Sequence, residues 1–161
     1  MFKVGDMAVY PAQGVGVIER IEAREFGGER QEFYILRIVD SDMKIMIPIT
    51  NADLVGMRCL IPKDRVSTVF DILGEKEAED QAVASWSRRQ REYNEKIKSG
   101  DLLEVAKVLR ELYLIKEVKE LSYGEKKVLE LARKLLVKEI ALAEGAREEQ
   151  IVERVENIFV N

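Results

Sequence analysis

The sequence Val17-Ile-Glu-Arg-Ile-Glu-Ala-Arg24, followed after Gly27-Gly28 by the run from Gln31 to Val39, decides the fold of the amino-terminal half. Both runs mix apolar and charged residues with the period of two that is typical of a half-buried β-strand. The glycine pair between them is a reversal signal, because glycine readily adopts the positive φ angles of tight hairpin turns. Together they predict an antiparallel β-hairpin.

Shorter strands are expected on either side of this hairpin. One surrounds Ala8 to Tyr10 and lies between the turn signals Gly5-Asp6 and Pro11-Ala-Gln-Gly14. The other is Met43-Lys-Ile-Met-Ile-Pro-Ile49, which follows the turn Asp40-Ser-Asp42. Several short strands joined by tight turns within so few residues predict a small, strongly bent antiparallel barrel.

The side chains of a strand point alternately to its two faces, which divides the last two strands between core and surface. The core face is predicted to hold Tyr34, Leu36, Ile38, Met43, Ile45, Ile47 and Ile49. The outer face is predicted to hold Phe33, Ile35, Arg37, Lys44, Met46 and Pro48. The proline confines its strand to a sheet edge or a bulge. An apolar outer face on an edge strand is either a docking surface for another protein or a surface covered by the second half of the chain.

After Pro62 the sequence period changes to that of an α-helix. Residues 63–73 predict a short helix that ends at Gly74, and the acidic run Glu75-Lys-Glu-Ala-Glu-Asp80 predicts a connector. A longer helix is then expected over residues 80–98.

Three more amphipathic helices are expected in the carboxy-terminal half. Asp101 caps the first of them, with Glu104 at the capping-box position. Ser122-Tyr-Gly-Glu125 is a full capping box that opens the second, and Gly145 closes it. The third covers about residues 148–159. We therefore expect an α+β protein of two domains, with a small antiparallel β-barrel at residues 1–70, a connector at 71–80 and a compact all-helical domain at 81–161.

The composition argues against an enzyme. The 161-residue chain has no histidine and one cysteine, Cys59, which removes serine–histidine and cysteine–histidine pairs and the usual zinc ligand sets. Gly14-Val-Gly16 is too short for a dinucleotide-binding fingerprint and precedes a strand pattern. Glu92 and Glu95 are the alternative catalytic pair, but three residues apart among arginines they suit ion pairing better. We expect no catalysis, no metal and no cofactor.

The sequence also carries signals about location. No apolar run is long enough to cross a membrane, and the first residues lack the apolar core of a signal peptide. A single cysteine is typical of a reducing compartment. We therefore expect a cytoplasmic protein.

The carboxy-terminal half contains a cationic stretch, Trp86-Ser-Arg88-Arg89-Gln-Arg91-Glu92-Tyr93, with the only tryptophan of the chain. The net charge of the whole chain is −4, so this local excess of arginine runs against the average. Arginines on a helix can bind phosphates while an indole inserts against or between bases. The same residues also fit an amphipathic helix with solvated charges and a buried tryptophan. The stretch alone leaves both interpretations open.

Lys126 and Lys127 fall in the first turn of the helix predicted after Ser122. The helix dipole disfavours cations at this end by several tenths of a kcal/mol. The placement would be useful if a phosphate backbone lay near the helix start, because its amides and the lysines would both attract it.

Ordered landmarks run through nearly the whole chain. In the first half they are Phe2-Lys-Val-Gly-Asp6, Val9-Tyr-Pro-Ala-Gln-Gly-Val-Gly16, Phe33-Tyr-Ile-Leu36, Met43-Lys-Ile-Met-Ile-Pro48 and Val55-Gly-Met-Arg58. In the second half they are Trp86-Ser-Arg-Arg89, Lys96-Ile-Lys-Ser-Gly-Asp101, Glu104-Val-Ala-Lys-Val-Leu-Arg-Glu-Leu112 and Leu121-Ser-Tyr-Gly-Glu-Lys126. Together these motifs resemble the CarD family of bacterial transcription regulators, in its short stand-alone form.

The resemblance implies a Tudor-like or SH3-like amino-terminal module that binds the β subunit of RNA polymerase. The implied contact positions are Ile35, Met46 and Pro48, with Arg24 nearby. Arg37, on the same predicted outer face, is also expected to contact the polymerase. Some members of the family have arginine where this chain has Met46, so the docking implied here is more apolar.

The resemblance also implies a helical domain on promoter DNA at the upstream edge of the melted bubble, where Trp86 would wedge into the minor groove. The basic residues that the resemblance places on phosphates are Arg88, Arg89, Arg91 and Lys126, and Lys127 is added from its position in the same first helical turn. Some members have another basic residue at the position of Ile115, a contact that this chain lacks.

The function expected from the resemblance is a non-catalytic factor that stabilises the open promoter complex with little sequence specificity, and that associates with the nucleoid through RNA polymerase. The alternative is a protein-only adaptor on RNA polymerase, in which the basic stretch faces acidic side chains and DNA is not contacted.

Overall fold

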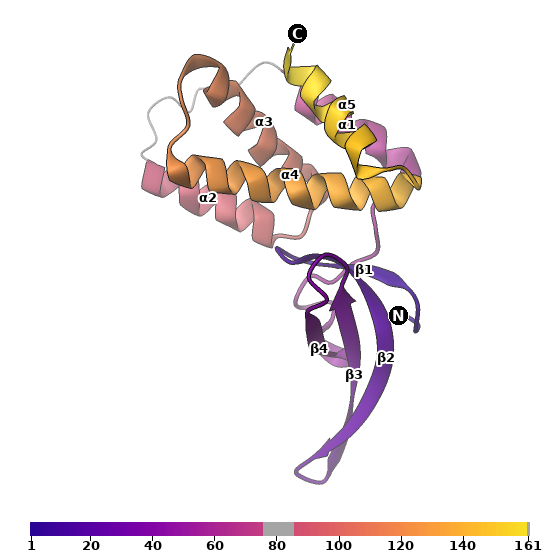
Figure 1. Ribbon diagram of the computed structural model, residues 1–161. Helices are drawn as coiled ribbons and strands as arrows, with labels where there is room; N and C mark the ends of the chain where they lie inside the picture. The colour runs from indigo at the N-terminus through magenta and orange to yellow at the C-terminus, as the bar shows by residue number, and fades with distance from the viewer. Residues whose placement is uncertain (76–85, 161) are drawn as a thin grey trace. The chain divides into compact units, whose positions relative to one another are not determined.

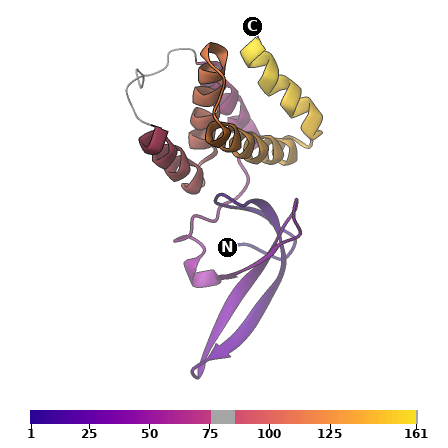
Figure 2. The same ribbon diagram turned by 60° about the vertical axis from the view of Figure 1, so that its left-hand side comes forward.

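The hairpin predicted from residues 17–39 is the centre of the amino-terminal sheet. The computed structural model describes residues 1–75 and 86–160, and its sheet has the strand order β1-β2-β3-β4 with antiparallel pairing throughout. The strands are β1 (Met7–Tyr10), β2 (Gly14–Phe26), β3 (Glu29–Ile38) and β4 (Lys44–Pro48). Figures 1 and 2 show β2 and β3 as a long, curved hairpin. The predicted strands are confirmed, and β4 lies at one edge of the described sheet.

A β-bulge in β2 changes which side chains face outward. The register of β2 against β3 shifts between Ile18 and Arg20, so that Glu19 is an extra residue in the ladder. Bulges bend and twist a strand, which suits the curvature of this hairpin. Gly16 permits a close approach of β3 just before the bulge, because a Cβ atom there would lie 2.6 Å from Cγ of Leu36.

One face of the sheet holds the core of the first unit. Its buried members are Ala8, Ile18, Tyr34, Leu36, Ile38, Ile47, Ala52 and Met57, with Phe2, Tyr10, Ile45 and Ile49 packed against them. The predicted core positions are confirmed except for Met43, which precedes β4 and is 42% exposed. After a 3₁₀ turn at Ile49–Asn51 the chain returns to β1, where the backbones of Val9 and Arg58 exchange hydrogen bonds of 2.7 and 3.1 Å. This pairing continues the curl of the sheet.

The second unit is helical. Within the described ranges its elements are a 3₁₀ turn (Lys63–Arg65), α1 (Val66–Gly74), α2 (Trp86–Lys98), α3 (Leu102–Val118), α4 (Tyr123–Glu144) and α5 (Glu148–Val160). None of these described helices is long and apolar enough to span a membrane. Most of the predicted connector, and the residues 80–85 predicted to begin the next helix, lie outside the described residues. A sheet unit followed by a helical unit confirms the predicted α+β class.

The helix α1 packs with the helical unit. Contacts divide the chain into Met1–Leu60 and Ile61–Asn161, and α1 packs against α3 and α5. The amide of Ile61 also donates a 2.8 Å hydrogen bond to the buried carboxylate of Glu139, which ties the segment before α1 to α4. The domain boundary expected near residue 70 therefore falls inside a helix of the second unit, because periodicity identifies a helix but not its packing partner.

The helix ends follow the predicted capping residues. Asp101 caps α3 through its side chain, and Ser122-Tyr-Gly-Glu125 forms a reciprocal capping box at the start of α4. Gly145 ends α4 with a φ angle of 67°. Glu104 occupies the position expected to complete a capping box at α3, and its carboxylate accepts a 3.0 Å hydrogen bond from Nζ of Lys107. Side-chain caps therefore define where α3 and α4 begin.

Candidate functional site

The outer face of β3 and β4 contains an apolar strip made of Phe33, Ile35, Met46 and Pro48. Phe33 pairs with Pro48 and Ile35 with Met46 in the register of β3 and β4, so the side chains adjoin. Met46 is 38% exposed, whereas Phe33 and Ile35 are only 6% and 5% exposed. The accessible part of the apolar strip is therefore its β4 half.

Side chains of the hairpin lie beside Phe33 and Ile35. Arg20 lies across from Ile35 in the ladder, and Glu22 lies across from Phe33. The ring of Phe26 packs edge-on against that of Phe33, with centroids 6.0 Å apart. Long charged side chains can cover apolar surface with their stems. Phe33 and Ile35 thus lie on the predicted outer face but are buried there.

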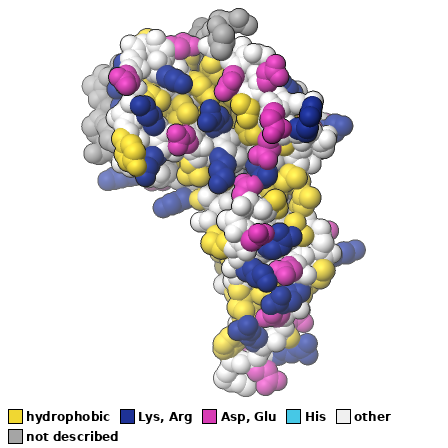
Figure 3. Space-filling model, in the orientation of Figure 1, with side chains coloured by type: hydrophobic (Ala, Val, Ile, Leu, Met, Phe, Trp, Pro, Cys, Tyr) yellow, Lys and Arg dark blue, Asp and Glu magenta, His cyan; other side chains and the backbone are white. Residues whose placement is uncertain are grey.

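Ion pairs border the apolar strip along β2. Nε of Arg20 lies 2.6 Å from Oε1 of Glu22, and Arg24 lies 3.2 Å from Oε2 of the same carboxylate. The hydrogen bond from Arg20, supported by Arg24, holds the pKa of Glu22 below its ordinary value of 4.5. Because Glu19 is the bulge residue, it reaches Lys44 of β4 at 3.4 Å. Figure 3 shows basic and acidic side chains interspersed along the sheet.

The residues that the sequence predicts as polymerase contacts thus lie on one face of the sheet, but they differ in how exposed their side chains are. Arg24 is exposed and paired with Glu22, and Arg37 is half-buried and lies 3.2 Å from Asp42. Among the apolar contacts, Met46 is exposed, Pro48 is half-buried and Ile35 is buried. The face therefore offers an apolar edge with cations beside it.

The cationic stretch predicted from the sequence lies in α2. Trp86 is the first described residue of this helix, and its side chain lies outside the described part of the structure. Arg88 and Arg91 are exposed, and Nε of Arg88 lies 3.6 Å from the carboxylate of Glu92. Tyr93 is 1% exposed and packs into the unit. The helix is amphipathic, with these two arginines on its solvent side.

Arg89 points into the helical unit instead. Its side chain is 15% exposed, and one of its Nη atoms lies 3.6 Å from Oε2 of Glu125 at the start of α4. Glu125 is buried, and its Oε1 accepts a 2.9 Å hydrogen bond from the amide of Ser122. Nζ of Lys119 approaches the same oxygen at 3.8 Å. Arg89 therefore joins α2 to α4 and is not one of the exposed cations.

The protonation states in this contact follow from burial and charge. Burial raises the pKa of Glu125, but the hydrogen bonds from Ser122 and the cations Lys119 and Arg89 outweigh it, so its pKa lies below the ordinary value of 4.5. Burial, with the nearby Glu111 carboxylate, raises the pKa of the Tyr93 hydroxyl. At neutral pH an ionised Glu125 thus faces Arg89 beside a neutral phenol.

The amino end of α4 adds further cations beside α2. Lys126 and Lys127 are exposed. The contact between Arg89 and Glu125 brings the Trp86 end of α2 next to this end of α4, as Figure 1 also shows. Tyr123, the first residue of α4, is 73% exposed. It was not predicted from the sequence to be a surface residue, because there it appears only as part of the capping-box motif. We call Arg88, Arg91, Tyr123, Lys126 and Lys127 the α2–α4 surface.

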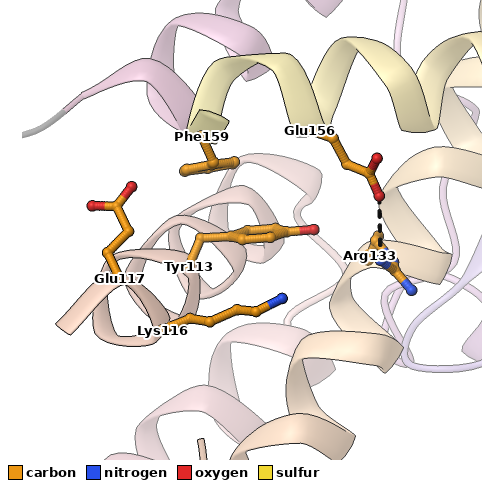
Figure 4. Close-up of a pocket in the computed structure, with 6 residues that line it drawn as sticks. All are labelled: Tyr113, Lys116, Glu117, Arg133, Glu156 and Phe159. Carbon is orange, nitrogen blue, oxygen red and sulfur yellow. Dashed lines mark ion pairs between the residues drawn. The ribbon is translucent and has the colours of Figure 1, made fainter. Parts of the chain in front are cut away.

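Two adjoining cavities lie on the helical unit, and the second is lined in part by Lys126 of the α2–α4 surface. The first, of about 340 Å³, is drawn in Figure 4, where the Tyr113 ring lies between Phe159 and Lys116. Arg133 lies 3.9 Å from Glu156 in this cavity, and the rings of Tyr113 and Phe159 stack with their centroids 4.2 Å apart. The second, of about 510 Å³, lies between α3 and α4 and shares Lys116 and Arg133 with the first. The first cavity is therefore a helix junction with balanced charge.

Comparison with known protein families finds a matching family domain for each of the two units. The CarD-like/TRCF RID domain matches residues 2–68, and the CarD C-terminal domain matches residues 68–156. The chain belongs to the CarD family. The family predicted from the landmarks is confirmed, and the chain is a member of a family of transcription regulators rather than enzymes. The two CarD domain models meet at residue 68, within α1.

One relative is similar to this chain over nearly its whole length. YdeB from Bacillus subtilis (strain 168), named as a candidate transcription factor, is 35% identical over 158 residues, which are 94% of this chain and 97% of YdeB. A solved structure of CdnLNt from Myxoccoccus xanthus is 54% identical, covers 38% of this chain and 86% of its own, and has a TM-score of 0.33.

Proposed function

We propose that this CarD-family protein binds the β subunit of RNA polymerase through its β unit and promoter DNA through its helical unit, and that it thereby stabilises the open promoter complex. The observation that carries the proposal is the α2–α4 surface, which gathers exposed cations in a chain with a net charge of −4. Local positive charge on an acidic protein favours a negatively charged partner at that place.

The docking part of the proposal rests on the edge strand β4. Met46 is exposed and Pro48 half-buried on this strand, and the buried Ile35 lies beside Met46 on the same face. Arg37 and Arg24 lie on the same face and would contact polar groups at the rim. An apolar centre with a polar rim is the common anatomy of a protein interface. The match to the RID domain supports the polymerase as the partner.

The DNA part of the proposal assigns different roles to the basic residues. Arg88, Arg91, Lys126 and Lys127 are exposed and would contact phosphates. Arg89 would act indirectly, because its contact with Glu125 holds the Trp86 end of α2 beside α4. Trp86 would then wedge at the upstream edge of the melted DNA.

A wedge of this kind changes the equilibrium between closed and open promoter only if it binds the open state better. Stacking of an aromatic ring on an exposed base contributes about 1–3 kcal/mol, or about 5- to 160-fold in an equilibrium constant. Few phosphate contacts on an acidic protein give weak, salt-sensitive affinity for DNA alone. Docking on the polymerase would raise the local concentration of the helical unit at the promoter.

The direct test is the lifetime of the open complex with Trp86→Ala. We expect the lifetime to shorten by about 5- to 160-fold, because the open state loses the stacked indole. The measurement is the decay of polymerase–promoter complexes after addition of a competitor. Lys98→Gln, at the opposite end of α2, is the control and should leave the lifetime unchanged.

An unchanged lifetime in a folded, polymerase-bound Trp86→Ala protein would reject the wedge. If, in addition, no residue of the α2–α4 surface crosslinks to promoter DNA in the complete complex, the protein is a protein-only adaptor on the polymerase.

A further inference from the structure

We propose that Tyr123 is a second aromatic contact to nucleic acid, on which an unpaired base of the melted promoter stacks. The proposal rests on the proposed function, since it takes promoter DNA as the partner of the α2–α4 surface. It adds a residue that neither the cationic stretch nor the family landmarks assign a role.

The exposure of Tyr123 sets it apart from the other tyrosines of the helical unit. Its side chain is 73% exposed, the highest value among the aromatic side chains that the structure describes, whereas Tyr93 and Tyr113 are 1% and 8% exposed. Aromatic side chains stabilise a fold chiefly by burial. The capping box at this end is made by Ser122 and Glu125, so the ring is not needed for the cap. Tyr123 therefore contributes little to the fold.

The ring is nevertheless held in place. Nζ of Lys127, one helical turn later, lies 4.7 Å from the centroid of the Tyr123 ring. A cation over the face of an aromatic ring is attracted to it. This contact restricts the ring before binding, which lowers the entropy lost when a partner stacks on it. Because the ring is 73% exposed, most of it stays accessible.

The charges around Tyr123 favour nucleic acid over protein as the partner. Lys126 and Lys127 are exposed beside it, and Lys119 lies near the same helix start through its approach to Glu125. The carboxylate of Glu125 is buried, so it offers little repulsion at the surface. Aromatic rings next to cations are how proteins bind unpaired bases with little sequence preference.

The position of Tyr123 relative to α2 completes the argument. The contact of Arg89 with Glu125 places the Trp86 end of α2 beside the first turn of α4. Two aromatic residues thus lie at neighbouring helix ends, with arginines on one helix and lysines on the other. Such a pair can engage two bases of a parted duplex, or a base and the adjoining backbone.

The experiment compares variants of the full chain in the complete polymerase–promoter complex. We expect Tyr123→Ala to shorten the open-complex lifetime by about five-fold or more, and Tyr123→Phe to stay within about two-fold of the unmodified protein, because phenylalanine keeps the stacking face. Leu131→Ala is the matched control, since Leu131 is an exposed apolar residue further along α4. A photoreactive phenylalanine at position 123 should crosslink to promoter DNA.

The outcomes separate this proposal from the proposed function. An unchanged lifetime with Tyr123→Ala, when Trp86→Ala shortens it, overturns the role of Tyr123 and leaves the wedge standing. Crosslinks from position 123 to polymerase polypeptide alone also overturn it, since the ring then contacts protein. Unchanged lifetimes with both variants and no DNA crosslink from either position reject the proposed function and this proposal together. The crosslink does not depend on how well the alanine variant folds.

Discussion

Glu125 links several features of the helical unit through one carboxylate. It completes the capping box with Ser122 and forms an ion pair with Arg89 of α2. It also lies near Lys119, at the end of α3. A buried carboxylate is tolerated only where hydrogen bonds and cations compensate for lost hydration. Removing it affects the cap and the attachment of α2 at once. Glu125 is therefore the residue whose charge positions the α2–α4 surface.

Glu125→Gln should lower the stability of the helical unit at pH 7 by about 1–3 kcal/mol, because Arg89 loses a buried counterion. The pKa of Glu125 in the folded protein lies below 4.5, so its charge stabilises the fold above that pH. This contribution is lost as the pH falls from 4.5 through the folded-state pKa, so acid should destabilise the native protein more than the variant. Urea unfolding followed by circular dichroism at several pH values measures both effects.

Glu130→Gln is the control for this experiment, since Glu130 is an exposed carboxylate on the same helix. Equal pH dependence in the native protein and in Glu125→Gln would contradict a depressed pKa at this position.

At the scale of the element, the edge strand β4 and the bulge in β2 shape the outer face of the sheet. The bulge turns both Glu19 and Arg20 outward, where they form ion pairs with Lys44 and Glu22. The pair Arg20–Glu22 lies along the β2 side of the apolar strip, and the strip is accessible mainly at Met46. Exposed edge strands usually carry charges or proline that limit self-association. Here Lys44 and Pro48 play that part while an apolar residue between them stays accessible.

Met46→Asp should weaken binding to the polymerase β subunit by ten-fold or more, because a buried charge without a partner costs about 2–5 kcal/mol at an interface. The substituted protein should stay folded, since Met46 is 38% exposed on an edge strand. The measurement is the dissociation constant for a β-subunit fragment. Thr50→Asp makes the same charge change at an exposed position just after β4, and it should bind normally. Normal binding by Met46→Asp would move the docking surface to another face.

At the scale of the whole molecule, each unit has its own hydrophobic core. Leu36 belongs to the core of Met1–Leu60, and Leu109 is fully buried within Ile61–Asn161. Separate cores allow one unit to bind the transcription machinery while the other contacts a second partner. The net charge of −4 opposes binding to DNA by the chain alone. Docking of the β unit on the polymerase would therefore raise the local concentration of the helical unit, so that its weak contacts with DNA can form.

Leu36→Ala and Leu109→Ala should each destabilise their own unit by about 2–5 kcal/mol through lost burial and a new cavity. Both side chains are 0% exposed in the native protein. Hydrogen exchange measured by mass spectrometry should show faster exchange in β1–β4 for the first variant and in α1–α5 for the second. Faster exchange across the whole chain in either variant would show that the units unfold as one.

The elements and the caps were predictable from sequence because they depend on residues close together in the chain, and the family because short motifs recur in order along it. Alternation over Gln31 to Val39 predicts a strand, and the box Ser122-Tyr-Gly-Glu125 predicts a helix start, since both patterns involve neighbours up to a few residues apart. Only the tertiary structure decided that Arg89 faces Glu125, that Ile35 is buried and that α1 belongs to the helical unit. These outcomes depend on which distant residue packs opposite, and a local period carries no information about that partner.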